Sequence, residues 1–153
     1  MRNKPKACII DIDGVLCDSF RQDFVQQFEQ GDYEMFERLI PTYSSNAWAV
    51  SLVNSLSKDH VILFVTARDS AYRDATIAWL DKHLDTSNMH SKNLYMRTEG
   101  DRRPDSEIKL ELYKQFKCGY DILFAIDDNI SNCTLWKSLG ITALTNTITE
   151  EKK

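Results

Sequence analysis

The sequence predicts an α/β fold in which about five mostly parallel strands form one sheet with helices on both faces, a three-layer arrangement. Short apolar runs rich in β-branched residues alternate along the chain with segments of helical periodicity. These runs are nearly continuous, as in parallel strands that are buried on both faces. The chain has 153 residues without an internal repeat or a linker, so we expect a single domain over 1–153.

The first half of the chain is expected to alternate between strand and helix. The run "KACIIDI" is short and apolar, which is typical of a buried strand. Phe20, Phe24 and Phe28 recur at i, i+4 and i+8, which is helical spacing. Asp69 or Ser70 can cap the helix that follows them. The predicted elements are a strand over 6–12, helices over 19–30, 33–40 and 46–58, a strand over 60–67 and a helix over 69–84.

The second half continues this alternation. The run "YDILFAID" is typical of another buried strand, and Gly140 can end the helix that follows it in a left-handed conformation. The predicted elements are a strand over 93–97, a helix over 105–116, a strand over 120–127, a helix over 129–140 and a strand over 141–146, before a charged tail.

Composition limits the classes of protein that fit. The net charge of −4 gives no general attraction for nucleic acid, so a phosphate-rich partner would need a local basic patch. The sequence contains no run of about 18 apolar residues, so a membrane span is not expected. The N-terminal residues lack the apolar stretch of a signal peptide. We therefore expect a cytoplasmic protein without a membrane partner. The 4 cysteines form no C-x-x-C pair and are expected to be reduced thiols.

Polar residues follow the predicted strands at their carboxyl ends, the edge where parallel α/β sheets bind ligands. Several carboxylates in one small volume repel each other, and a divalent cation relieves that repulsion. A ligand set of oxygens without His or Cys favours Mg²⁺. The residues expected at this edge are Asp11, Asp13, Thr66, Arg68, Arg97, Asp127 and Asp128.

A Mg²⁺ site beside Thr66 and Lys109 is suited to a phosphate group, because the metal and the lysine offset the charge of the phosphoryl oxygens. A carboxylate placed there can attack phosphorus and form an aspartyl-phosphate. A second carboxylate two residues later can protonate the leaving oxygen and then activate water. We therefore interpret Asp11 as a nucleophile and Asp13 as a general acid/base, with Gly14 allowing a tight turn around the phosphoryl group.

Four motifs in order resemble those of the haloacid dehalogenase-like (HAD) hydrolases. They are "DIDGV" at 11–15, "VTAR" at 65–68, Lys109, and "AIDDN" at 125–129. The resemblance implies a Rossmann-like sheet of the HAD type and Mg²⁺-dependent phosphoryl transfer, with Thr66 and Lys109 binding phosphate. It also implies that Asp127 or Asp128 holds the metal together with Asp11 and the backbone carbonyl of Asp13.

A narrower resemblance is to the 3′-phosphatase domain of phage polynucleotide kinase–phosphatase. It rests on "KPKACIIDIDGVL" at 4–16, "MRTEGDRRPDSEIK" at 96–109 and "AIDDNISNCTLWKSLGI" at 125–141. This family removes a 3′-phosphate from DNA or RNA ends and from nucleoside 3′-phosphates. The chain lacks a G-x-x-x-x-G-K-[ST] loop, so we expect a stand-alone phosphatase. The residues that match the family's basic stretch are Arg97, Gly100, Asp101, Arg103, Asp105 and Lys109.

Two departures from this family affect the predicted substrate contacts. Asn129 stands where the family often has an arginine after the paired aspartates, which removes one possible phosphate contact. Residues 18–45 form a short insert with a Phe-rich helical segment, which we expect to pack against the core. The alternative is a lid whose aromatic face stacks on a base. In either case a small cap leaves the site open to a polynucleotide end.

The basic residues are expected to differ in their roles. Arg97 directly follows a strand and is expected to bind substrate. Arg102 and Arg103 could bind substrate or be solvated loop charges, and Arg103 is counted among the expected substrate-binding residues. Arg68 could bind substrate or pair with a carboxylate.

Two other functions fit parts of this pattern. The motifs hold only the phosphoryl group, so nucleoside 5′-monophosphates are an alternative substrate. A receiver-like phospho-acceptor module also combines acidic residues, Thr or Ser and Lys around Mg²⁺. A receiver, however, places its acidic pair before the phospho-acceptor aspartate. In this chain the D-x-D motif is the first of the motifs and the D-D pair is the last.

Overall fold

The computed structural model describes residues 3–18, 33–85 and 93–146. Within these ranges, five parallel strands form one sheet in the order β5-β4-β1-β6-β7. The first strand of the chain is therefore central, with β4 on one side and β6 on the other. The strands are β1 (Lys6–Ile10), β4 (Val61–Asp69), β5 (Leu94–Arg97), β6 (Asp121–Ile126) and β7 (Thr142–Leu144).

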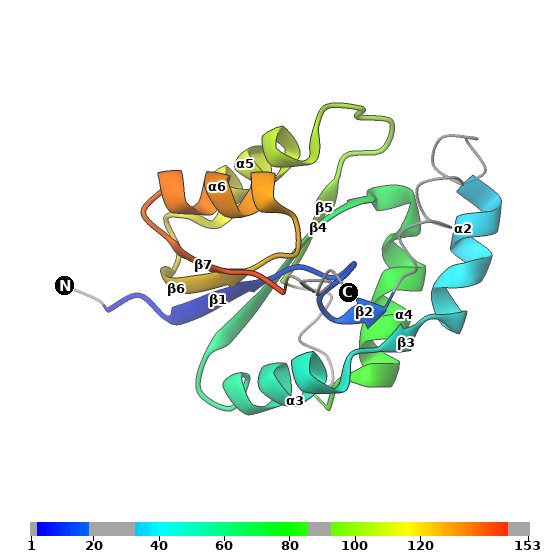
Figure 1. Ribbon diagram of the computed structural model, residues 1–153, viewed down its shortest axis with the longest axis horizontal. Helices are drawn as coiled ribbons and strands as arrows, with labels where there is room; N and C mark the ends of the chain where they lie inside the picture. The colour runs from blue at the N-terminus through cyan, green and yellow to red at the C-terminus, as the bar shows by residue number, and fades with distance from the viewer. Residues whose placement is uncertain (1–2, 19–32, 86–92, 147–153) are drawn as a thin grey trace, which may run out of the picture.

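Helices cover both faces of this sheet (Figure 1). On one face lie α5 (Asp105–Phe116) and α6 (Ile130–Ser138), and on the other lie α3 (Ala47–Leu56) and α4 (Arg73–His83). The expected three-layer α/β fold with a parallel sheet is thereby confirmed.

Alternate residues of the central strand pack into two separate hydrophobic cores, because successive side chains of a strand point to opposite faces. Cys8 and Ile10 join the core formed with α3 and α4, whereas Ala7 and Ile9 join the core formed with α5 and α6. All four side chains are at most 1% exposed. Burial on both faces explains why β1 is apolar from Ala7 to Ile10, and the next residue, Asp11, is buried as well.

The boundaries of the predicted helix over 69–84 differ from those observed. β4 continues to Asp69, and a 3₁₀ turn, η2 (Ser70–Tyr72), precedes α4. The Asp69 carboxylate accepts a hydrogen bond from the backbone N–H of Ala71 at 2.8 Å and so caps this 3₁₀ turn, whereas α4 itself follows Tyr72 without a side-chain cap. Gly140 has a φ of 80°, the left-handed conformation expected after the last helix.

The insert between β1 and α3 contains the predicted helix over 33–40, observed as α2, and three elements that are too short to predict from periodicity. Its described part comprises α2 (Tyr33–Leu39), the 3₁₀ turn η1 (Ile40–Thr42), and the short antiparallel strands β2 (Cys17–Asp18) and β3 (Ser44–Ser45). The predicted helix over 19–30 lies outside the described residues. Phe36 and Ile40 are buried in the same core as α3 and α4, so the described part of the insert packs against the body of the domain.

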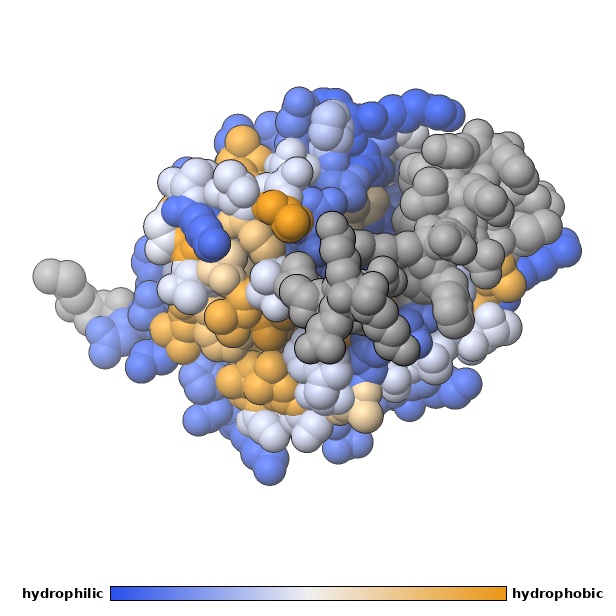
Figure 2. Space-filling view, viewed as in Figure 1, coloured by the Kyte–Doolittle hydropathy of each residue, from blue (hydrophilic) through white to orange (hydrophobic). Residues whose placement is uncertain are grey.

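The surface around the sheet is polar where loops leave the strands. Figure 2 shows hydrophilic residues over the upper part of the visible face, where α5 and the loop between β5 and α5 lie, and apolar residues lower down, between β6 and α3. In the described part of the chain, no helix has the length and apolar character needed to cross a membrane.

Candidate active site

Three carboxylates from two neighbouring strands meet at the carboxyl edge of the sheet. Asp11 follows β1, and Asp127 and Asp128 follow β6, which pairs directly with β1. One oxygen from each carboxylate lies within 4.8 Å of the others. Asp11 and Asp127 are only 6% and 1% exposed. We call Asp11, Asp127, Asp128 and the adjoining Lys109 the acidic centre.

Lys109 reaches the acidic centre from α5 and bridges two of its carboxylates. Its Nζ donates to Asp11 Oδ1 at 2.9 Å and to Asp127 Oδ2 at 2.6 Å, and its side chain is 1% exposed. Burial disfavours the charged lysine, but the attraction of Asp11 and Asp127 outweighs burial and raises its pKa above the ordinary value. The lysine is therefore held as a cation between the ends of β1 and β6.

The negative charge of the acidic centre exceeds what one lysine can balance. Burial raises the pKa of Asp11 well above its ordinary value, Lys109 opposes that shift, and the neighbouring aspartates reinforce it. A divalent cation among these oxygens would stabilise the ionised carboxylates. The donor set contains only oxygens, which fits a hard cation such as Mg²⁺.

Gly14 makes room for one of the candidate metal ligands. Its φ is 84°, in the left-handed region, and a Cβ atom built there would lie 2.1 Å from Asp128 Oδ2. Any other residue would therefore displace the Asp128 carboxylate as well as strain the backbone. The turn predicted at Gly14 is observed, and its close packing against Asp128 adds a second reason for glycine.

Asp13 is held by an arginine rather than by the lysine. Arg68 donates from Nε to Asp13 Oδ2 at 2.8 Å and from Nη2 to Asp13 Oδ1 at 2.7 Å, a two-pronged pair. The other terminal nitrogen, Nη1, donates to Thr76 Oγ1 at 3.2 Å, and the guanidinium lies 5.6 Å from the centre of the Phe36 ring. Of the two roles left open for Arg68, the structure shows the pairing with a carboxylate.

Thr66 lies beside this pair with its hydroxyl hydrogen available. Its Oγ1 accepts from the backbone N–H of Arg68 at 3.1 Å, and the residue is 1% exposed. A hydroxyl that accepts one hydrogen bond can still donate another. Thr66 lies in the second half of β4, the strand next to β1. Its hydroxyl group is therefore near the edge of the sheet expected from the sequence.

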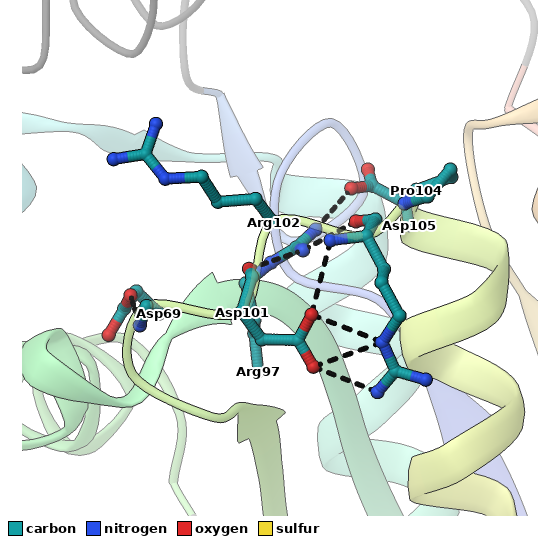
Figure 3. Close-up of a pocket in the computed structure, with 8 residues that line it drawn as sticks. Asp69, Arg97, Asp101, Arg102, Pro104 and Asp105 are labelled. Carbon is teal, nitrogen blue, oxygen red and sulfur yellow. Dashed lines mark hydrogen bonds and ion pairs between the residues drawn. The ribbon is translucent and has the colours of Figure 1, made fainter.

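The arginines at the end of β5 and just after it lie in one loop, 97–105, which we call the basic loop. Arg97 is 5% exposed and donates four hydrogen bonds: to the carbonyls of Ala67, Asp101 and Arg103 and to Asp105 Oδ1. Arg103 pairs with Asp101, with Nη2 at 2.8 Å from Oδ2 (Figure 3). The prediction that Arg97 and Arg103 bind substrate stays a prediction, but these contacts favour a supporting role.

One residue that supports the acidic centre, Asn132, was not predicted from the sequence. Asn132, in the first turns of α6, is 2% exposed, and its Nδ2 donates to Asp127 Oδ1 at 3.2 Å. The same oxygen accepts from the backbone N–H of Asn129 at 3.0 Å. Asn129 itself caps α6 through its side chain. The sequence pattern that could have indicated this role is a polar residue on the buried face of the predicted helix that follows the D-D pair.

A parallel sheet with D-x-D after its central strand, and Thr, Lys and an acidic pair around it, places the chain in the HAD superfamily. More narrowly, the family model for the polynucleotide kinase PNKP phosphatase domain matches residues 5–147. The chain therefore belongs to the family of PNKP phosphatase domains. The comparison with curated proteins found no significant match.

Solved structures share the fold at low sequence identity. A chain of the Pnkp1/Rnl/Hen1 RNA repair complex is 21% identical with a TM-score of 0.73, over 96% of this chain and 44% of that one. A class C acid phosphatase from Bacillus anthracis with tungstate bound is 18% identical with a TM-score of 0.61, over 86% and 54%. A HAD family enzyme from Bacteroides thetaiotaomicron, in a magnesium complex, is 18% identical with a TM-score of 0.54, over 99% and 98%. This chain thus spans less than half of the repair-complex chain.

Proposed function

We propose that the protein is a Mg²⁺-dependent phosphatase that removes the 3′-phosphate from polynucleotide ends or from nucleoside 3′-monophosphates. The observation that carries this proposal is the acidic centre, in which the Asp11 carboxylate is buried between Lys109 and a second acidic pair. Membership of the PNKP phosphatase family supports the 3′-phosphate as the group removed.

The residues that would hold Mg²⁺ are Asp11, Asp127 and Asp128, with a further oxygen from the backbone carbonyl of Asp13 as the HAD resemblance implies. The ion would offset the charge of the carboxylates and of the phosphoryl oxygens when bound. The excess of carboxylates over cationic side chains in this buried position is what fits a divalent cation. The magnesium complex of the Bacteroides HAD enzyme is consistent with this choice of metal.

Asp11 acts as the nucleophile in this proposal. Lys109 holds Oδ1 at 2.9 Å, which leaves Oδ2 to attack phosphorus. The new bond joins Oδ2 to phosphorus while the bond from phosphorus to the ester oxygen breaks. Lys109 also donates toward the phosphoryl oxygens, and Thr66 offers its free hydroxyl hydrogen to them.

Asp13 acts as the general acid and then as the general base. It gives a proton to the departing ester oxygen, and it later takes a proton from the water that attacks the aspartyl-phosphate. That second step releases inorganic phosphate and restores the Asp11 carboxylate. The two-pronged contact from Arg68 fixes the orientation of Asp13, so Arg68 is a positioning residue.

The proposal is tested by phosphate release in Mg²⁺ from three substrates in parallel. They are a 3′-phosphorylated oligonucleotide, a nucleoside 3′-monophosphate and a nucleoside 5′-monophosphate. We expect kcat/KM to be higher for both 3′-phosphates than for the 5′-monophosphate. A preference for the 5′-monophosphate would keep the roles of Asp11 and Asp13 but overturn the 3′-phosphatase assignment.

A further inference from the structure

The basic loop borders a cavity at the same edge of the sheet as the acidic centre. This cavity has a volume of about 360 Å³. It is lined by Asp69 at the end of β4 and by residues of the loop, including Arg97, Gly100 and Arg102 (Figure 3). β5 is two strands from β1 in the sheet, and neighbouring strands are spaced by about 4.8 Å, so the ends of β5 and β1 lie about 10 Å apart. That separation is within reach of a polynucleotide strand whose terminal phosphate lies at Asp11.

The basic loop is held in place by contacts to the neighbouring turn. The backbone N–H of Gly100 donates to Asp69 Oδ2 at 3.0 Å, and that of Glu99 donates to Ser70 Oγ at 3.1 Å. Gly100 adopts a φ of 79°, and Arg97 ties the two ends of the loop together through the carbonyls it binds. A loop tied in this way presents its remaining side chains in a defined place.

Almost every charge that lines the cavity is already compensated. Arg97 is paired with Asp105, and Arg103 with Asp101. Hydrogen bonds from Arg103 lower the pKa of Asp101 to about 2, so this pair stays ionised at neutral pH. The Asp69 carboxylate accepts from the backbone N–H groups of Ala71 and Gly100.

Arg102 is the exception. It is exposed, and across residues 3–18, 33–85 and 93–146 it has neither an ion pair nor a side-chain hydrogen bond. Figure 3 shows its side chain extended away from the paired residues, across the open space above Asp69. The loop therefore fixes the Cα of Arg102 while it leaves the guanidinium available to a ligand.

We propose that Arg102 binds a backbone phosphate of a polynucleotide substrate, one that lies inward from the terminal phosphate held at Asp11. This inference rests on the proposed 3′-phosphatase function and adds polynucleotide selectivity to it. A guanidinium can bind two phosphate oxygens at once. On a protein with a net charge of −4, one unpaired arginine beside the reaction centre is a local source of attraction for a polyanion.

The test compares Arg102→Gln with wild type on two substrates, a 3′-phosphorylated oligonucleotide and the matching nucleoside 3′-monophosphate. Only the oligonucleotide has a phosphodiester for Arg102 to bind. We expect the ratio of kcat/KM for the oligonucleotide to kcat/KM for the mononucleotide to fall about 5- to 10-fold, mainly through KM. The slope of log kcat/KM against log salt for the oligonucleotide should also become shallower by about 0.7.

Lys117→Gln is the matched control, because it removes one exposed positive charge at the end of α5, at the opposite edge of the sheet. We expect this variant to keep the wild-type ratio of the two kcat/KM values. An unchanged ratio in Arg102→Gln, or an equal fall in Lys117→Gln, overturns the inference. Either result would leave the proposed 3′-phosphatase function intact as long as the wild-type enzyme prefers 3′-phosphates.

A binding measurement separates this inference from the proposed reaction. Fluorescence anisotropy of a labelled 3′-phosphorylated oligonucleotide on Asp11→Asn, with and without Arg102→Gln, needs no turnover. A 5- to 10-fold weaker Kd in the double variant supports the role of Arg102 even if wild type releases no phosphate from either substrate, the result that would reject the proposed function. Equal Kd values for Asp11→Asn and for the double variant overturn the role of Arg102.

Discussion

The acidic centre and the basic loop differ in how they compensate their charges. In the acidic centre, one lysine faces three carboxylates, and the side chains of Asp11, Lys109 and Asp127 are almost fully buried. In the basic loop, Arg97 and Arg103 each have their own aspartate. The clustered carboxylates of the acidic centre thus suit a bound cation, whereas the charged side chains of the basic loop mostly pair with one another. The difference shows that an arginine-rich motif can serve mainly to build a loop.

The largest effect is expected from a substitution of Asp11 in the acidic centre. If the acidic centre is the reaction centre, Asp11→Asn should lower kcat by about 10⁴-fold or more, because an amide oxygen cannot serve as the nucleophile. The measurement is phosphate release from a 3′-phosphorylated oligonucleotide, with the urea midpoint of unfolding as the control for folding. A variant that keeps a substantial fraction of wild-type kcat would exclude Asp11 as the nucleophile.

Chelation of the metal should have the next largest effect. We expect EDTA to abolish phosphate release and Mg²⁺ to restore it, since the excess negative charge of the acidic centre is what the ion would balance. A second readout is the melting temperature, which Mg²⁺ should raise because it binds the folded state alone.

Asp128→Asn and Arg103→Gln form the matched pair for this prediction. Asp128→Asn removes a candidate ligand and should reduce the rise in melting temperature caused by Mg²⁺, whereas Arg103→Gln should keep it. Full activity in EDTA, or equal Mg²⁺ shifts in the two variants, would contradict a metal site among Asp11, Asp127 and Asp128.

Arg68→Lys tests whether the orientation of Asp13 matters, as distinct from its charge. Lysine keeps the positive charge but loses the two-pronged contact at 2.8 and 2.7 Å. We expect kcat to fall by about 10- to 100-fold with little change in KM, because the affected step is proton transfer. A rise in KM at constant kcat would instead assign Arg68 to substrate binding, the role that the sequence left open.

Arg97→Ala should act mainly on stability. The substitution leaves three backbone carbonyls and Asp105 without their donor in a site where Arg97 is 5% exposed. We expect the free energy of unfolding in urea to fall by about 3 kcal/mol. Arg97→Lys can donate to only some of these four acceptors, so its free energy of unfolding should lie between those of wild type and Arg97→Ala. A variant with unchanged stability but a raised KM would move Arg97 into the substrate site.

The elements that the sequence predicts well are those set by repeated burial. The apolar runs around Ile9 and Leu63 are buried on both faces, so their pattern alone predicts central parallel strands, and the aspartates and Thr66 follow from the strand ends. The strands β2 and β3 have two residues each, which is too short for any periodicity to appear.

Partners of side chains are harder to predict than positions along strands. Arg97 ends β5 as expected, yet three of its hydrogen bonds go to backbone carbonyls, whose directions depend on the loop conformation and cannot be read from residue types. Asn132 contacts Asp127 only because α6 begins where it does, with Asn129 as its cap. Sequence thus predicts which residues meet at the edge, and the structure adds which of them are still free to bind.

The smallest effect is expected at Arg103, in the exposed part of the basic loop. Hydrogen bonds from Arg103 hold the pKa of Asp101 at about 2, below the ordinary value of 3.8. A carboxylate whose pKa is lower in the folded state adds stability above its unfolded pKa and loses it as pH falls toward the folded pKa, here between about pH 4 and pH 2. Because the pair is exposed to solvent, Arg103→Gln should leave the urea midpoint at pH 7 almost unchanged. NMR titration of the Asp101 carboxyl carbon should nevertheless show its pKa moving up toward 3.8 in this variant. If the pKa stays near 2, another group must hold Asp101, and the basic loop is not compensated in the pairwise way that separates it from the acidic centre.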